Sequence, residues 1–417
     1  RNAFYAQSGG VTSVINASAA GVIEACRANK DSIGTLYAGQ NGILGALHEN
    51  LIDTSKETPT AVASLKHTPG GAFGSCRYKM RDHNEDSSEY ERLVEVFKAH
   101  NIGYFFYNGG GDSADTCLKV SQIAARMNYP LQAIHIPKTI DNDLPFTDCS
   151  PGFGSVAKYV AVSTKEASLD IASMCASSTK IFILEVMGRH AGWIAASGGL
   201  AAEEAGDPPH IIIFPEIPFS RDEFIAKVDA TVKDKGYCVV VASEGAKYAD
   251  GALISGSLHK DAFGHQQLGG VAQTLASMVK NSLGHKYHYA LADYLQRSAR
   301  HIASKTDVEQ AYAVGKGAVE KALEGKGGIM VTIERGTGKK YSWSLGEAPL
   351  SKIANVEKKM PRSFITKEGF GITEKAREYF QPLIIGEDYP PYKNGVPQYA
   401  KLKNILVQKK LEEGFKG

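Results

Sequence analysis

One short segment, Pro137–Asp143, gathers the residue types that a group-transfer reaction needs. It contains a cation (Lys138), a hydroxyl (Thr139) and two carboxylates (Asp141 and Asp143), and it follows an apolar run. Alternate side chains of an extended segment share one side, so Thr139, Asp141 and Asp143 would point the same way. A carboxylate there can accept a proton from a hydroxyl nucleophile. Lys138 can neutralise charge that develops on a phosphate.

The same carboxylates are candidate metal ligands. Mg²⁺ prefers oxygen ligands and commonly keeps water and substrate phosphates among them. Asp141 or Asp143 could complete such a set directly or through water. A plain Asp- and Asn-rich turn without chemistry is the alternative interpretation of these residues, so the segment must be weighed with the other motifs.

Two glycine-rich turns, Ser8-Gly9-Gly10 and Gly109–Ser113, each separate an apolar run from a stretch with helical spacing. A turn without Cβ atoms lets backbone N–H groups approach an anion closely, and the helix N-terminus adds partial positive charge. Together they predict a site for a phosphate chain, whereas each alone could be only a tight turn. Neither turn matches the Lys-containing P-loop or the Gly-x-Gly-x-x-Gly pattern, which disfavours both of those nucleotide folds.

The elements that must position these turns repeat one pattern, in which a short apolar run, a turn and a helical period follow one another. Strands that alternate with helices predict parallel sheets with right-handed crossovers. In such sheets, ligands bind at the carboxyl ends of the strands, where these turns lie. The candidate strands are Ala3–Ala6, Ile102–Tyr107, Leu131–Ile136, Ile181–Val186, Ile211–Phe214, Tyr237–Ala242 and Gly328–Ile333.

Composition excludes several classes of protein. The 417 residues are 43% hydrophobic and 22% charged, with a formal net charge of +2, which is typical of a globular protein and not of a disordered one. There is no strongly basic run of the kind that nucleic-acid binding needs. No apolar stretch approaches the 18 residues of a membrane span. The six cysteines are scattered, which favours reduced thiols in a cytoplasmic protein over disulfides or a metal cluster.

Six motifs occur in an order and spacing that resemble phosphofructokinases, over roughly residues 3–335. They are Ser8-Gly9-Gly10, Gly109–Ser113, Pro137–Asp143, Pro151–Ser155, Met187-Gly188-Arg189 and Tyr294-Leu295-Gln296-Arg297. The resemblance is to the pyrophosphate-dependent branch, because ATP-dependent members normally have Gly at the positions of Asp112 and Lys138. The Asp112 carboxylate would repel the α-phosphate of ATP. Lys138 would offer a cation to the smaller, highly charged donor.

This resemblance implies reversible, Mg²⁺-dependent transfer of a phosphoryl group from pyrophosphate to the C1 hydroxyl of fructose 6-phosphate. Asp141 matches the family's base, Thr139 a residue that lines the transferring phosphate, and Asp143 a second carboxylate. The implied pyrophosphate-binding residues are Gly9, Gly10, Arg77, Gly110, Gly111, Ser113 and Lys138. The family loop usually has a magnesium-binding Asp where this chain has Gly111. Either Asp112 serves as the metal ligand, or Mg²⁺ is held by Asp141, Asp143, water and substrate phosphates.

The resemblance also implies a sugar-phosphate site and its completion by another subunit. Lys180 stands where family members present an Arg to a neighbouring subunit's substrate, and His288 matches a second such position. A homo-oligomer, with a dimer favoured, follows from this. The implied sugar-binding residues are Thr139, Asp141, Lys180, Met187, Gly188, Arg189, Glu244, Tyr294 and Arg297.

The family fold implies two Rossmann-like, three-layer αβα lobes with mainly parallel sheets. We expect a donor lobe from residues 1–150 plus about 287–350, and a sugar lobe from 151–286 plus about 351–417. The chain is longer than compact bacterial relatives, and the additional residues fall in an insertion at about 248–285 and in the C-terminal extension. Bacterial ATP-dependent members bind anionic effectors with arginines on the first helix. Ala20 and Glu24 stand there in this chain, which predicts little allosteric response.

Three other functions are weighed against this one. An ATP-dependent phosphofructokinase would normally lack Lys138 and Asp112. A non-catalytic, sugar-phosphate-binding subunit should have lost the Asp pair or the Lys, and this chain keeps all three. A dinucleotide-dependent dehydrogenase would need a Gly-x-Gly-x-x-Gly turn in its first unit.

Overall fold

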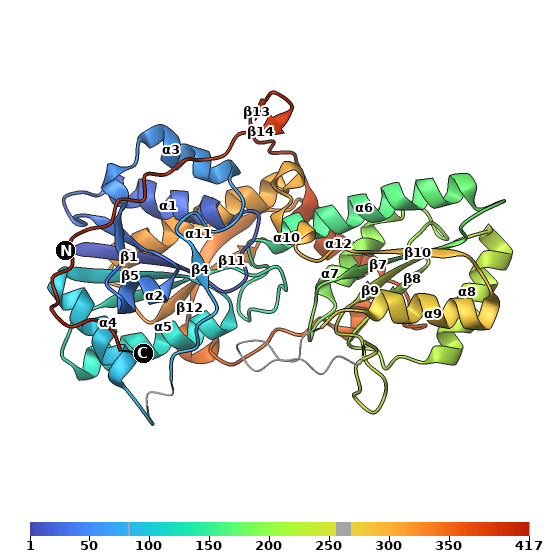
Figure 1. The fold of residues 1–417 in the computed structure, drawn as a ribbon, viewed down its shortest axis with the longest axis horizontal. Coiled ribbons are helices and arrows are strands. Elements are labelled where there is room, and N and C mark those ends of the chain that lie inside the picture. Colours follow the sequence, from blue (N-terminus) through green and yellow to red (C-terminus); the bar gives the residue numbers. More distant parts are fainter. Residues whose placement is uncertain (82–83, 256–267, 417) are drawn as a thin grey trace. The chain divides into compact units, whose positions relative to one another are not determined.

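The computed structural model describes residues 1–81, 84–255 and 268–416, and it divides into two compact units (Figure 1). The chain passes from unit 1 to unit 2 and back twice. Unit 1 comprises Arg1–Gly152, Lys305–Lys358 and Gly386–Gly417, and unit 2 comprises Phe153–Ser304 and Lys359–Ile385. These boundaries differ from the sequence-based ones in three places, because residues 287–304 lie in unit 2 and residues 351–358 and 386–417 belong to unit 1.

Unit 1 is built on an eight-stranded sheet in the order β12-β11-β6-β5-β1-β2-β3, with β4 paired to β1. The central strands pair in parallel, while β2–β3 and β11–β12 are antiparallel. The sheet is therefore mainly parallel, as the alternating pattern predicts. Its strands are β1 (Asn2–Ser8), β2 (Leu36–Gly39), β3 (Leu51–Asp53), β4 (Ser75–Cys76), β5 (Ile102–Gly109), β6 (Gln132–Pro137), β11 (Ile329–Arg335) and β12 (Trp343–Pro349).

Helices cover both faces of this sheet, with α1 and α11 on one face and α4 and α5 on the other (Figure 1). The contact between α1 and α11 depends on glycine, since a Cβ on Gly21 would lie 2.3 Å from the carbonyl oxygen of Tyr312. Short 3₁₀ turns connect several elements. The helices of unit 1 are α1 (Ile15–Ala28), α2 (Ile43–Leu47), α3 (Pro59–Ser64), α4 (Ser88–Ala99), α5 (Gly111–Arg126) and α11 (Lys305–Leu323).

Unit 2 is built on a four-stranded, fully parallel sheet in the order β10-β7-β9-β8. Figure 1 shows α6 and α7 over one face and α8 and α9 over the other. Its strands are β7 (Ile181–Val186), β8 (Ile211–Ile213), β9 (Cys238–Ser243) and β10 (Tyr287–Leu291). Its helices are α6 (Phe153–Met174), α7 (Trp193–Ser197), α8 (Arg221–Lys235), α9 (Val271–Leu283), α10 (Leu295–Ser298) and α12 (Glu374–Phe380).

Alternate residues of the unit 2 strands build a core with α8 and α9. Ile181 and Ile183 of β7 pack in one cluster with Phe224 and Leu275 from the two helices, and all four are buried. Burying each such side chain contributes about 1.5–3 kcal/mol relative to exposure. This core fixes the ends of β7 and β9, from which the predicted sugar-binding loops leave the sheet.

The last segment of the chain forms an additional edge on the unit 1 sheet. The backbone of Asp53 donates to the carbonyl of Ile405, and that of Val407 donates to the carbonyl of Leu51, each at 2.9 Å. Ile52 and Leu406 form an antiparallel bridge between these bonds. An unpaired edge strand tends to pair with other chains. The segment therefore covers the edge that β3 would otherwise present.

Two buried carboxylates hold this segment in place. Glu57 accepts backbone hydrogen bonds from Lys403 and Asn404 at 3.0 and 2.8 Å. Glu49 accepts one from Lys410 at 2.6 Å and also pairs with buried His100 at 2.6 Å. Earlier in the segment, β13 (Tyr392–Lys393) and β14 (Val396–Pro397) form a small hairpin.

The mainly parallel α/β fold predicted from the sequence is confirmed, and each candidate strand is present with shifts of up to two residues at its ends. Of the predicted insertion at about 248–285, residues 256–267 lie outside the described residues, and α9 occupies Val271–Leu283. Among the helices that the structure describes, none is both long and apolar enough to cross a bilayer.

Candidate active site

The predicted donor residues of unit 1 leave neighbouring strands at their carboxyl ends. The register pairs Gln7 of β1 with Asn108 of β5, and Gly109 of β5 with Pro137 of β6. The turns after these three strands therefore leave the sheet at one edge. Ligands of parallel α/β sheets bind at such an edge.

Gly9 and Arg77 are held beside each other by β4. Ser8 at the end of β1 pairs with Cys76 of β4, and the backbone of Gly9 donates to the Cys76 carbonyl at 3.0 Å. Gly9 has a left-handed backbone, with φ at 72°. Arg77 follows Cys76 directly and its side chain is exposed, so its guanidinium can reach an anion above the Gly9-Gly10 turn.

The second glycine turn has a tight half and an open half. A Cβ on Gly109 would lie 2.1 Å from the Ser113 hydroxyl, whereas a Cβ on Gly111 would meet nothing within 4 Å. The Ser113 hydroxyl donates to that of Ser8 at 2.7 Å, which ties the two glycine turns together. Gly110 precedes α5, and Asp112 lies exposed in its first turn. The open half places backbone N–H groups of a helix N-terminus beside free space.

Lys138 is the buried cation of this half-site. Lys138 is only 4% exposed, and its ammonium donates to the carbonyl of Gly10. A Cβ on Gly9 would lie 3.6 Å from the Lys138 nitrogen, so the cation sits directly beneath the first glycine turn. Its own backbone N–H donates to the Gly109 carbonyl at 3.0 Å. Lys138 thus contacts both glycine turns.

The carboxylates that follow are presented by a folded turn and not by an extended segment. The Thr139 hydroxyl accepts the backbone N–H of Asp141 at 3.1 Å. Asn142 adopts a left-handed backbone, with φ at 55°, and its side-chain oxygen accepts the backbone N–H of Ser150 at 3.0 Å. Asparagine tolerates this conformation better than most residues. Asn142, which lies between the two carboxylates in sequence, therefore shapes the turn that carries Asp141 and Asp143.

The electrostatics of this turn favour a proton on the Asp143 carboxyl. Burial, followed by the nearby carboxylates of Asp141 and Glu357, raises the pKa of the Asp143 carboxyl to about 7. Neighbouring carboxylates resist simultaneous ionisation. A carboxyl whose pKa is raised towards neutrality is a candidate acid–base group.

In unit 2, the predicted sugar residues follow adjacent strands in the same way. Val186 of β7 pairs with Ser243 of β9, so Met187 and Glu244 both leave the sheet at its carboxyl edge. The backbone of Gly188 donates to the Glu244 carboxylate at 3.4 Å. Gly188 has φ at 133°, and a Cβ there would lie 2.9 Å from the Ala191 carbonyl oxygen, so only glycine fits without strain.

The segment after β10 joins the same edge. The backbone of Met187 donates to the side-chain oxygen of Gln296 at 3.2 Å, which places Gln296 beside the Met187–Arg189 loop. The Arg297 guanidinium lies over the Tyr294 ring, 3.8 Å from its centroid, and Tyr294 is 59% exposed. Such a pair holds the cation in a defined position at the surface.

Lys180 and His288 are not brought together with these residues. Lys180 precedes β7 and therefore lies at the amino end of the sheet, whereas Met187 lies at its carboxyl end. Six strand residues span about 20 Å. The Lys180 ammonium donates to the Cys175 carbonyl at 2.6 Å. His288 is exposed on β10, an edge strand, and pairs in register with Phe182.

Comparison with known proteins places this geometry in a family. The model of the phosphofructokinase family matches residues 2–322. The chain belongs to the phosphofructokinase family. The resemblance predicted from the six motifs is therefore confirmed.

Named relatives extend over the whole length of this phosphofructokinase. It is 65% identical to pyrophosphate–fructose 6-phosphate 1-phosphotransferase of Halomonas elongata over 412 residues, 99% of this chain and 98% of the relative. It is 62% identical to the protein of the same name from Methylococcus capsulatus, over 100% of this chain and 99% of the relative. A solved structure of pyrophosphate-dependent phosphofructokinase from Marinobacter aquaeolei matches with a TM-score of 0.92, 64% identity and 100% coverage of both chains.

The residues of this phosphofructokinase fit a magnesium ion that is shared with a substrate. No group of three His, Cys, Asp or Glu side chains with metal-binding geometry occurs in the described parts of the chain. Mg²⁺ needs no such group, because one or two carboxylates together with water and substrate phosphates suffice. Asp112 is exposed in the first turn of α5, next to the open space at Gly111. It can therefore supply a carboxylate to a metal held by a bound phosphate.

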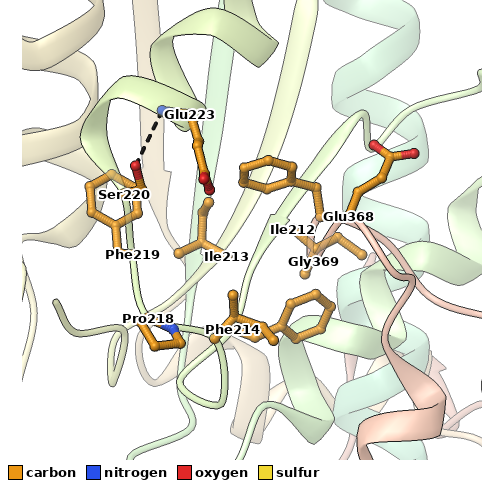
Figure 2. A pocket seen from close by; sticks show the side chains of 11 residues that line it. Ile212, Ile213, Phe214, Pro218, Phe219, Ser220, Glu223, Glu368 and Gly369 are labelled. Atoms are coloured by element: carbon orange, nitrogen blue, oxygen red, sulfur yellow. Dashed lines mark hydrogen bonds between the residues drawn. The ribbon is translucent and has the colours of Figure 1, made fainter. Parts of the chain in front are cut away.

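Figure 2 shows a pocket of unit 2 that is distinct from the predicted sugar residues. The Ser220 hydroxyl at its rim caps α8 by accepting the Glu223 backbone N–H at 3.3 Å. None of the predicted site residues lines this pocket. Its lining residues are Ile212, Ile213, Phe214, Ile217, Pro218, Phe219, Ser220, Glu223, Glu368, Gly369 and Phe370.

Sequence reasoning assigned no role to three residues that shape the site. Gln296 and Asn142 lie within recognised motifs, so their hydrogen-bonding side chains were a usable signal. His135 lies on β6 and is fully buried, and burial lowers the pKa of its imidazole to about 3, opposed by the backbone of Gly110. A lone histidine in an apolar strand carries no such signal. It packs as a neutral ring behind the second glycine turn.

Proposed function

We propose that this chain catalyses the reversible, Mg²⁺-dependent transfer of a phosphoryl group from pyrophosphate to the C1 hydroxyl of fructose 6-phosphate. The products are fructose 1,6-bisphosphate and phosphate. The observation that carries this function is Lys138, whose buried ammonium lies directly beneath the Gly9-Gly10 turn and reaches the Gly10 carbonyl. A fixed cation beneath amide-lined turns suits a compact, highly charged donor. The names of the full-length relatives agree with this donor.

Asp141 acts as the general base in this mechanism. Its carboxylate takes the proton of the C1 hydroxyl as the C1 oxygen attacks the terminal phosphorus of pyrophosphate. The new carbon–oxygen–phosphorus linkage forms as the bond from that phosphorus to the bridging oxygen breaks, and phosphate leaves with the bond's electron pair. Asp143, whose carboxyl has a pKa raised to about 7 by burial and neighbouring carboxylates, offers a nearby place for the proton.

The glycine turns bind and orient the donor. The amides of Gly9, Gly10, Gly110 and Gly111, the Ser113 hydroxyl and Arg77 surround the phosphate chain. Lys138 and Thr139 face the phosphoryl group in transit. Because the transition state places its charge on oxygens, fixed donors that surround them lower the barrier. When bound, Mg²⁺ would be held by Asp112 and substrate phosphate oxygens and would supply charge neutralisation.

Unit 2 carries the sugar-phosphate-binding residues of the proposed enzyme. Met187, Gly188, Arg189 and Glu244 share one edge of the sheet with the Tyr294–Arg297 segment. Glu244 can accept hydrogen bonds from sugar hydroxyls, while Arg189 and Arg297 can pair with the 6-phosphate.

The site is completed by a second copy of the chain, in a homo-oligomer and most simply a dimer. Lys180 and His288 support this, because both lie away from the edge that holds Met187. The β10 edge and the segment that follows it expose large apolar side chains, which favour a protein contact. These are Tyr289, Leu291, Tyr294 and Leu295, from 38% to 65% exposed. A cytoplasmic protein that binds neither nucleic acid nor membrane fits the near-neutral charge of this chain.

A donor assay tests the function directly. Purified protein would be given fructose 6-phosphate and Mg²⁺ with pyrophosphate, ATP or polyphosphate offered separately, and fructose 1,6-bisphosphate would be measured with coupling enzymes. We expect turnover with pyrophosphate and little with the other two donors. Turnover with ATP but not with pyrophosphate would refute the proposal.

A further inference from the structure

Lys358 connects two parts of the loop that carries the candidate catalytic carboxylates. Its backbone N–H donates to the carbonyl of Asp143 at 2.6 Å. Its ammonium donates to the carbonyls of Thr147 and Asp148 at 3.1 and 2.9 Å. Lys358 is distant in sequence and lies in the segment after β12, so no local pattern brings it to this loop.

The loop has two limbs that close on each other. Asn142 accepts the Ser150 backbone N–H at 3.0 Å, and the backbones of Asn142 and Phe146 are both left-handed, with φ at 55° and 63°. The first limb carries Asp141 and Asp143. The second limb, Thr147–Ser150, returns to the start of α6. Lys358 is bonded to both limbs, so it fixes their separation.

The second limb is in turn anchored to the sheet of unit 1. The backbone of Asp148 donates to the Ile333 carbonyl at 2.8 Å, and Ile333 donates to the Thr147 hydroxyl at 2.9 Å. The Arg335 guanidinium pairs with the Asp148 carboxylate at 3.0 Å. Through Lys358, the limb that carries Asp143 is therefore linked to the rigid strand β11.

The chemistry of Lys358 distinguishes it from an ordinary surface lysine. Burial lowers the pKa of its ammonium to about 8, because removing the cation from water disfavours its charged form. The two carbonyls that it contacts would lose a charge-assisted partner without it, and such bonds are stronger than neutral ones. Lys359, the next residue, is exposed and provides a matched comparison.

We propose that Lys358 is a positioning residue, which acts through the loop to hold Asp141 at its working distance from the acceptor hydroxyl. This inference rests on the proposed function, in which Asp141 is the base. Lys358 touches no reacting atom, so its loss should change the rate of the chemical step and leave substrate binding nearly intact. A small misplacement of a catalytic group can reduce the rate by about 100-fold.

The test compares the variants Lys358→Met, Lys358→Arg and Lys359→Met under saturating substrates. For K358M we expect kcat to fall by about 10- to 100-fold, with both KM values within about 3-fold of the wild type. K358R, which keeps the cation and its donors, should recover a large part of that loss. K359M should behave like the wild type. Circular dichroism and Tm would establish that each variant is folded.

Two results would overturn the proposal. A folded K358M with kcat within about 2-fold of the wild type would show that the loop does not need this contact. If neither K358M nor K358R folds, Lys358 is a folding residue and not a positioning one. The comparison uses whichever donor the wild type accepts, so a failure of the pyrophosphate assignment is detected separately, by the wild-type donor assay.

Discussion

The two units of this phosphofructokinase hold their predicted binding residues differently. In unit 1 the predicted donor-binding residue Lys138 is 4% exposed, and it is bonded to one glycine turn by its ammonium and to the other by its backbone N–H. In unit 2 the loop backbones are held equally well, but Tyr294 is 59% exposed, and Lys180 lies at the other end of the sheet. Lys138 is thus enclosed within unit 1, whereas the predicted charged sugar-binding side chains of unit 2, Arg189, Glu244 and Arg297, are half-buried.

This contrast has a physical reason. Pyrophosphate is small and offers few contacts, so its site must supply fixed charge that needs little reorganisation during the reaction. A sugar phosphate is larger and can be held by several side chains that contribute binding without changing the chemical step. Substitutions in unit 1 should therefore act mainly on kcat or donor choice, and those in unit 2 mainly on KM. Five experiments test this difference.

The largest effect is expected from Asp141→Ala in unit 1. Loss of a general base should lower kcat by about 10²- to 10⁴-fold. The side chain is only partly buried, so the fold should persist, as measured by circular dichroism and Tm. Steady-state rates with pyrophosphate provide the measurement. A near-normal kcat would remove Asp141 as the base.

The double variant Lys138→Gly, Asp112→Gly should change the choice between pyrophosphate and ATP. It replaces the two residues that are expected to distinguish these donors. Removing a charge-assisted contact of about 1.5–3 kcal/mol should lower kcat/KM for pyrophosphate by about 10- to 100-fold. Removing the Asp112 carboxylate should raise kcat/KM for ATP above the wild-type value. An unchanged preference would mean that these two residues do not select the donor. The single variants separate the two contributions.

A smaller effect of a different kind is expected from Arg297→Met in unit 2. It should raise the KM for fructose 6-phosphate by about 10-fold, with kcat within about 3-fold, because it removes binding that the ground state and the transition state share. Arg221→Met provides a matched control, since Arg221 is an exposed arginine at the start of α8. A large fall in kcat for R297M would contradict the proposal that substitutions in unit 2 act mainly on KM.

Acid should lower the free energy of unfolding of unit 1, because His135 is buried as a neutral imidazole. Burial lowers the pKa of this imidazole to about 3, so below its unfolded value near 6.5 the unfolded chain binds the extra proton. The free energy of unfolding should then fall by about 1.4 kcal/mol per pH unit as pH drops from 6.5 towards 3. His210 of unit 2, with its pKa lowered to about 4 mainly by burial, contributes over a narrower range.

Urea denaturation of the wild type and His135→Leu between pH 7.5 and 4.5 measures this slope. The difference between the two proteins isolates His135, because the remaining histidines are common to both. Equal slopes would show that the imidazole is not neutral in the folded state. Replacing His210 instead should change the slope less, which compares the two units directly.

The smallest expected effect is the response to ADP. Ala20 is fully buried in α1, and Glu24 is already engaged by Lys66 at 3.3 Å and by the Tyr312 hydroxyl at 2.5 Å. Neither offers a cation to an anionic effector. Rates at sub-saturating fructose 6-phosphate should change by less than about 2-fold when ADP is added. A strong activation or inhibition would contradict this.

Strands buried on both faces were predictable from sequence because they form short apolar runs, as Ile181–Val186 illustrates. The edge strands β10 and β12 were not, since Tyr287–Leu291 has only exposed or half-buried side chains and therefore lacks an apolar signal. Candidate site residues could be proposed from sequence where they fell in motifs. Lys358 and His135 could not be found in this way, because their roles arise from burial and from contacts between distant segments.

The covered edge of β3 has a consequence for how this protein is made. Unit 1 contains both the first residues of the chain and the segment after Gly386, while the first 152 of the unit 2 residues are contiguous from Phe153 to Ser304. On a ribosome, unit 2 can therefore begin to close while the unit 1 sheet still lacks β11, α11 and its edge cover. Glu49 and Glu57 can gain these backbone partners only after residues 403–410 have been synthesised. The sheet of unit 1, although its first strands precede those of unit 2 in the chain, is therefore completed after the sheet of unit 2.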